Sequence, residues 1–147
     1  MSTRACYTFK DNGGSFHVYK DHDGYPYDSD ENSEAGGLVW ISEAKPFAWP
    51  LPRFEANEFA ASFVRAHKTD NGGVRLINTK EPWEFSIDSE FWYQISCVDG
   101  QLYVSVYAVN WWEMDKGYRP IYRRDTLVME GPLDELLNKQ RSRKEVA

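Results

Sequence analysis

The chain has 147 residues, of which 16% are aromatic, and 23 acidic against 17 basic side chains give it a net charge of -6. This length fits one domain, the aromatic content excludes a disordered chain, and the negative charge argues against general polynucleotide binding. No apolar run approaches the roughly 20 residues that cross a bilayer. Cys6 and Cys97 lack metal-ligand spacing, so we expect a protein of a reducing cytoplasm with both thiols buried.

The first predicted element is a hairpin. Residues 4–10 and 15–20 alternate apolar and polar side chains, and Asp11 to Gly14 supply the turn, so Lys10 should pair with Ser15. That register puts an apolar set on one face: Tyr7, Phe9, Phe16 and Val18. The other face carries a mixed set: Cys6, Thr8, His17 and Tyr19. It also brings Arg4 beside Asp21.

An acidic loop follows Tyr19. A helix is predicted from Ser33, which can cap it, to the residue before Pro46, and the proline-rich run 46–52 should be extended. Apolar residues at three- and four-residue spacing predict a second helix over 54–68. A short strand is predicted over 74–78.

A second hairpin is predicted around Asp99-Gly100, with Val98 paired to Gln101. One face would be uniformly apolar, and the other would carry Trp92, Tyr103 and Tyr107 among polar side chains. A strand over 120–127, a helix from Pro132 to Arg141 and a frayed tail over 142–147 complete the chain. We therefore predict a single α+β domain over 1–141, with an antiparallel sheet of about five strands and two or three helices packed on one face.

The candidate ligand-binding residues cluster around the segment from His17 to Tyr25. They are polar or aromatic side chains gathered by the hairpin and its following loop: Arg4, His17, Tyr19, His22, Asp23 and Tyr25. Such a group suits a nucleotide, a small ligand or a hydrolase with a histidine base. A calcium-loop pattern fails because Tyr19 stands at its first ligand position. His17, His22 and Asp23 are chemically suited to a transition metal, but a solvated acidic loop is the favoured interpretation, and neither a metal nor a cofactor is expected. No catalytic motif is complete, and an enzyme is the less favoured interpretation.

A second candidate is a contact surface of carboxylates and rings. Its members are Asp28, Asp30, Glu31, Trp92, Tyr103, Tyr107, Trp111 and Trp112. Tryptophan and tyrosine concentrate in interface anchors. The alternative is that the proline-rich segment, with Trp40, Phe47 and Trp49, covers these rings.

Three segments carry a family resemblance. Met1-Ser-Thr-Arg4 opening a hairpin, Asp23-Gly24-Tyr25-Pro26, and the segment 51–60 resemble small proteins encoded by bacteriophages and prophages. His22 stands where those proteins commonly have an aromatic residue. The resemblance implies an accessory gene expressed in a bacterial cytoplasm, and it carries no assigned catalytic residues.

Together these features favour a non-enzymatic binding or inhibitor protein that acts on a host protein, plausibly against host defence. A nucleotide- or small-ligand-binding protein or hydrolase is the first alternative. The second is a self-assembling structural protein that uses the outer face of the second hairpin. No polynucleotide or membrane partner is expected.

Overall fold

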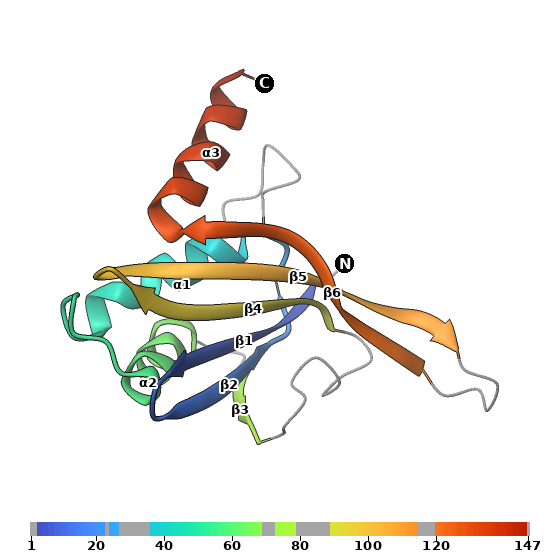
Figure 1. Ribbon diagram of the computed structural model, residues 1–147, viewed down its shortest axis with the longest axis horizontal. Helices are drawn as coiled ribbons and strands as arrows, with labels where there is room; N and C mark the ends of the chain where they lie inside the picture. Colours follow the sequence, from blue (N-terminus) through green and yellow to red (C-terminus); the bar gives the residue numbers. More distant parts are fainter. Residues whose placement is uncertain are drawn as a thin grey trace.

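The computed structural model describes residues 3–22, 24–26, 36–68, 73–78, 89–114 and 120–146, the stretches 110–114, 120–126 and 140–146 by their backbone alone. Six strands form one mixed sheet in the order β3-β2-β1-β4-β5-β6 (Figure 1). The strands are β1 (Arg4–Asp11), β2 (Gly14–Lys20), β3 (Val74–Ile77), β4 (Ser89–Val98), β5 (Gln101–Met114) and β6 (Pro120–Pro132). The predicted α+β class is confirmed.

The sheet differs from the prediction in two respects. It has six strands rather than five, and β1 pairs with β4 in parallel while all other pairs are antiparallel. The turn residues of a hairpin indicate in the sequence which strands are antiparallel neighbours. A parallel neighbour is reached by a crossover through distant elements, so local patterns do not reveal it.

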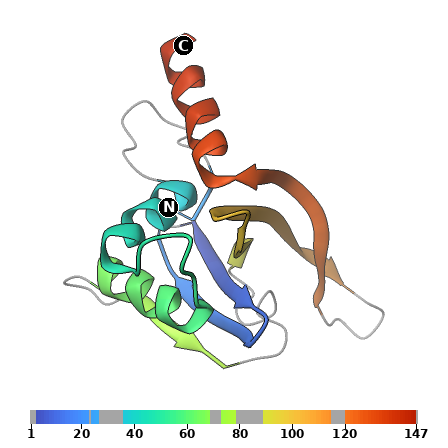
Figure 2. The same ribbon diagram turned by 60° about the vertical axis from the view of Figure 1, so that its left-hand side comes forward.

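Helices α1 (Gly37–Ala44) and α2 (Ala56–His67) cover one face of the sheet (Figure 2), and α3 (Leu133–Val146) follows β6 directly. The helix predicted over 54–68 is confirmed. The predicted start of α1 at Ser33 lies outside the described residues. The last helix extends past the predicted end at Arg141, and the fraying of 142–147 stays a prediction. Among the described residues, no helix combines the length and the apolar character needed to cross a membrane.

The proline-rich run 46–52 was predicted to be extended, but its first part is not. Lys45–Phe47 form a short 3-10 helix, η1, with Pro46 in its first turn, and the chain becomes extended only at Ala48. A first-turn residue needs no backbone N–H donor, so proline is tolerated there. The Leu51-Pro52 peptide bond is cis.

Both predicted hairpin registers are confirmed. Lys10 pairs with Ser15, and Val98 pairs with Gln101 across a turn in which Asp99 has a positive φ of 52°. Strand alternation then places the predicted apolar residues toward the helices. The main core packs aromatic rings from both layers: Tyr7 lies 4.6 Å from Tyr93 and 4.7 Å from Phe63, centroid to centroid.

The outer face of the sheet carries a second buried cluster. Its members are Cys6, Tyr19, Ile77, Trp92 and Val109, with Tyr107 packed against them. The sequence predicted a mixed polar and aromatic set for this face, and at these positions it is buried and largely apolar. Of the two thiols expected to be buried, Cys6 is fully buried and Cys97 is half-buried.

Candidate functional site

The structure places the predicted ligand-binding residues in more than one setting. His17 and Tyr19 point to the outer face of β2, because they alternate with Val18 and Lys20, which point toward the helices. His22 lies beyond the end of the strand and is exposed. His17 and Tyr19 therefore share one face of β2, whereas His22 lies past the end of that strand.

Two of the other three members, Arg4 and Tyr25, lie on neighbouring segments, because the Gly24 N–H donates to the Thr3 carbonyl at 2.8 Å. Arg4 begins β1, where it pairs with Ser89 of β4. Tyr25 contributes its backbone carbonyl, which accepts a hydrogen bond from the Gly37 N–H at 2.8 Å. Asp23 lies outside the described residues.

The predicted proximity of Arg4 and Asp21 is not part of the strand pairing, because the β1–β2 ladder ends at Ala5 and Lys20. The Asp21 N–H instead donates to the Gly73 carbonyl at 3.1 Å. Its carboxylate Oδ1 lies 3.5 Å from His22 Nε2. Asp21 thus joins β2 to the start of β3.

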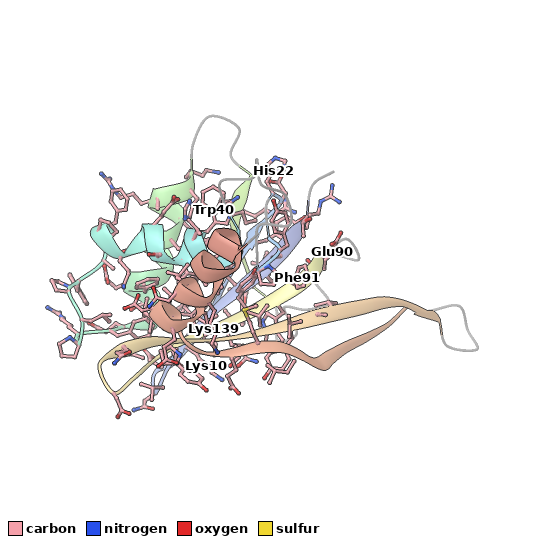
Figure 3. All side chains as sticks on the ribbon, turned by 90° about the horizontal axis from the view of Figure 1, so that it is seen from above. Lys10, His22, Trp40, Glu90, Phe91 and Lys139 are labelled. Atoms are coloured by element: carbon pink, nitrogen blue, oxygen red, sulfur yellow. The ribbon has the colours of Figure 1, made fainter. Side chains whose placement is uncertain are left out.

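A buried lysine, Lys20, organises this end of the sheet. Lys20 is 7% exposed, and its Nζ lies 4.1 Å from the ring centroid of Trp40 and donates to the His22 carbonyl at 2.9 Å. Figure 3 shows His22 and Trp40 at the same end of the molecule. Sequence reasoning missed Lys20, although it stands at a core-facing position of β2, where a charge needs partners.

Next to this lysine lies a buried histidine. His67 Nε2 donates to the Trp40 carbonyl at 2.7 Å, and its Nδ1 lies 3.9 Å from Glu43 Oε2. Burial lowers the pKa of His67, an effect to which the Lys20 ammonium adds. Burial also raises the pKa of Glu43. A neutral His67 that donates to a backbone carbonyl is a structural group here.

His17 belongs to a hydrogen-bond chain on the opposite face. Trp92 Nε1–H donates to Thr8 Oγ1 at 2.8 Å, and Thr8 Oγ1 lies 2.9 Å from His17 Nδ1. The Thr8 hydroxyl accepts from the indole and can donate its own proton to His17 Nδ1, an arrangement that requires the tautomer with the imidazole proton on Nε2. Burial lowers the pKa of His17, which favours this neutral form.

The structure also changes the interpretation of the predicted contact surface. Trp92 is only 6% exposed, because β4 lies inside the sheet and its outer side chains pack against those of neighbouring strands. Trp92 is thus a core residue of the outer face rather than an exposed anchor. Tyr103 and Tyr107 are half-buried. The remaining members, namely Asp28, Asp30, Glu31 and the side chains of Trp111 and Trp112, lie outside the described residues.

The structure gives the reactive side chains of the hydrolase alternative different environments. His17 and His22, its two candidate bases, occupy different settings, one in the outer-face chain and one beside Asp21. Burial raises the pKa of the Cys6 thiol to about 11, which keeps it from acting as a thiolate at neutral pH. Within the ranges that the structure describes, no group of three or more His, Cys, Asp and Glu side chains is placed to hold a metal ion.

The strongest surface feature is a pair of exposed rings, each covered by an arginine. Phe47 and Trp49 are 46% and 38% exposed. The Arg53 Cζ lies 3.6 Å from the ring centroid of Trp49, and the Arg65 Cζ lies 4.9 Å from that of Phe47. We call these four residues the arginine–aromatic surface.

Local structure fixes this surface against α2. Glu58 accepts the backbone N–H of Trp49 at 3.1 Å through Oε1, and it accepts the Ser62 hydroxyl at 3.0 Å through Oε2. Glu58 and Arg65 are two helical turns apart and so lie on the same side of α2. Short hydrogen bonds within the segment, such as Arg53 N–H to Pro50 C=O at 3.2 Å, restrict it further.

The proline-rich segment therefore does not cover the outer face of the second hairpin, which was the alternative considered for it. Trp40 packs against the main core on the helix side, while Phe47 and Trp49 point to solvent. The sequence signal for this surface was present, since two rings stand among closely spaced prolines. It was missed because Arg65, the partner of Phe47, comes from α2, and because the sequence does not show that Arg53 folds back over Trp49.

Comparisons with protein-family models, with curated proteins and with solved structures give no match to this chain.

Proposed function

We propose that this protein is a non-enzymatic binding protein and that the arginine–aromatic surface is its contact site. One observation carries the proposal: two large rings, Phe47 and Trp49, stay exposed on a braced segment, and each has an arginine guanidinium over its face. Tryptophan and arginine are the residue types most enriched among the few that dominate binding energy at protein interfaces.

The stacked arrangement suits recognition of carboxylates. A guanidinium that lies face-on to a ring keeps its N–H donors at the edge, where a planar carboxylate can accept two of them. Arg53 has an exposed ion pair with Glu55 at 3.6 Å, a contact of a kind that contributes little and can be exchanged for a partner's carboxylate. The rings supply apolar area beside these donors.

The segment is also held in place before any partner arrives. Its prolines, its 3-10 turn and the Glu58 hydrogen bond to Trp49 limit its conformations. Less ordering is then required on binding, so more of the contact energy appears as affinity. We infer a partner that presents acidic side chains around an apolar patch.

The resemblance to phage and prophage proteins supports a bacterial host protein as this partner and the bacterial cytoplasm as the compartment. An inhibitory or counter-defence role is the corresponding biological proposal. The acidic residues Asp28, Asp30 and Glu31 remain a proposed second contact.

The test is affinity purification of the tagged chain from a bacterial host, followed by binding measurements with the recovered protein. Trp49→Ala and Arg65→Glu should each weaken binding at least about tenfold. Val98→Ala, which changes an exposed apolar residue on the β4–β5 hairpin, serves as the matched control and should bind like the wild type.

Rising salt should weaken binding by the wild type more than binding by Arg65→Glu, since screening acts on the charge pair that the variant lacks. Full retention of affinity by Trp49→Ala would overturn the assignment of the surface. Recovery of no stoichiometric partner from any tested host would overturn the proposed function itself.

A further inference from the structure

The end strand β3 presents an exposed apolar edge on a part of the molecule separate from the arginine–aromatic surface. Leu76 is 68% exposed, and Phe16, predicted as a core residue, is 40% exposed. An open groove of about 370 Å³ lies between these side chains. Its lining comes from β2 and from β3 with the residue after it: Ser15, Phe16, His17, Leu76, Ile77 and Asn78.

The backbone of Leu76 faces away from the sheet. In an antiparallel pair, residues alternate between those that exchange hydrogen bonds with one neighbour and those that point to the other side. Asp21 N–H bonds to Gly73 C=O, so by the same alternation Arg75 and Ile77 bond to β2. The N–H and C=O of Leu76 then point outward, where no described strand lies beside β3.

We propose that β3 is a self-association edge: two copies of the chain pair antiparallel through β3, with Leu76 facing Leu76 of the second copy. This inference goes beyond the proposed function and does not depend on it. A two-fold axis at Leu76 lets each copy donate its N–H to the carbonyl of the other. The six-stranded sheet then continues across the axis.

The edge is self-complementary in side chains as well. Directly opposed residues point to the same face, so the two exposed Leu76 side chains meet on the helix side. Arg75 faces Ile77 of the other copy rather than a second arginine. Residues 73–78 contain no carboxylate, so this pairing sets no acids against each other although the chain carries a net charge of -6.

The length of β3 limits the strength of this contact. Four paired residues bury much less area than an obligate dimer needs, so the association should be weak and dependent on concentration. Short edge strands are also one way in which proteins avoid uncontrolled pairing. A reversible dimer, rather than a fibre, follows from the two-fold symmetry.

Sedimentation velocity of the full chain from about 1 to about 200 µM tests the proposal, over the range where weak dimers form. The wild type should shift from monomer toward dimer. Leu76→Pro removes the outward N–H without touching a bond to β2, and Leu76→Lys replaces the apolar contact with a charge. Both should stay monomeric over the whole range.

Leu127→Lys is the matched control, because Leu127 is exposed on β6 at the opposite edge. It should dimerise like the wild type, and so should Trp49→Ala, which separates this result from the proposed function.

A wild type that is monomeric throughout overturns the proposal, as does a dimer that persists in Leu76→Lys. Loss of the dimer in Leu127→Lys alone would assign the contact to β6 and also overturn it. If Leu76→Pro lowers the helical and strand signal in circular dichroism, Leu76→Lys decides the question.

Discussion

Asp11 Oδ2 accepts the backbone N–H of Ala56 at 2.7 Å, so a carboxylate in the turn between β1 and β2 caps the first residue of α2. The residue at the N-cap position, Glu55, makes no such bond with its own side chain. Asp11 Oδ1 also accepts the N–H groups of Gly13 and Gly14. One carboxylate thus closes a hairpin turn and ties it to a helix 45 residues away.

Asp11→Asn should lower the melting temperature by a few degrees at pH 7. The hydrogen bond from Ala56, followed by that from Gly13, lowers the pKa of Asp11 in the folded protein. The ionised carboxylate therefore stabilises the fold above the unfolded pKa near 4, and this contribution is lost as pH falls toward the lower folded pKa. Thermal melts should show a difference between wild type and variant that is full at pH 7 and shrinks below about pH 4; a difference that grows on acidification would contradict the assignment.

Hairpins and the amphipathic helix could be predicted because their signals are local. Asp99-Gly100 sets a two-residue turn, and every pair from Val98–Gln101 onward follows from it. The parallel contact of β1 with β4 has no such signal. It depends on how elements far apart in the sequence pack, which a single sequence does not display.

The site was harder to predict for the same reason. Gly37 disfavours a helix in the sequence, yet α1 begins with it. Glycine is required at this position because a Cβ there would overlap the Tyr93 hydroxyl. Lys20 and Arg65 gain their roles only from rings contributed by other segments. Sequence proximity suggested a site from His17 to Tyr25, but His17 and Tyr19 lie on the outer face of β2, while His22 and Tyr25 lie beyond the end of that strand.

Tyr93→Phe should reduce the free energy of unfolding by about 1–3 kcal/mol, the cost of leaving a buried polar group without its partner. The Tyr93 hydroxyl donates to the Gly24 carbonyl at 2.5 Å in the fully buried core. Urea unfolding followed by far-UV circular dichroism measures the change. The control is Tyr103→Phe, which removes a half-buried hydroxyl on the outer face of β5 that is hydrogen-bonded to Glu130. It should cost less, and equal costs would show that the Gly24 hydrogen bond stabilises the fold no more than this outer-face contact does.

Thr8→Val tests the hydrogen-bond chain of the outer face. Valine keeps the shape and removes the hydroxyl, so Trp92 Nε1 and His17 Nδ1 both lose their partner, and stability should fall by about 1–3 kcal/mol. Nitrogen-15 NMR of the wild type should show His17 with its proton on Nε2 at neutral pH. A wild-type imidazole protonated on Nδ1 would contradict the proposed direction of the chain.

The contact between His67 and the Trp40 carbonyl makes stability depend on pH. Burial lowers the pKa of His67, and the nearby Lys20 ammonium lowers it further, against the opposing effect of the Trp40 hydrogen bond. Below the unfolded pKa near 6.5 the unfolded state therefore binds more protons than the folded state, and stability falls as the pH drops toward the folded pKa. Of the carboxylates described near this ring, Glu43 faces it at 3.9 Å and itself has a pKa raised by burial.

His67→Gln should flatten this dependence, because glutamine can still donate to the Trp40 carbonyl but does not titrate. The measurement is the melting temperature between pH 7 and pH 5 for the wild type, His67→Gln and the control His22→Gln, in which an exposed histidine is changed. Wild type and control should lose similar stability over this interval, and His67→Gln should lose less. The loss of stability that remains in His67→Gln is assigned to His17, whose pKa is also lowered by burial. Combining His17→Gln with His67→Gln should therefore remove most of the loss of stability between pH 7 and pH 5. A double variant that loses as much stability as the wild type would show that neither buried histidine controls the response.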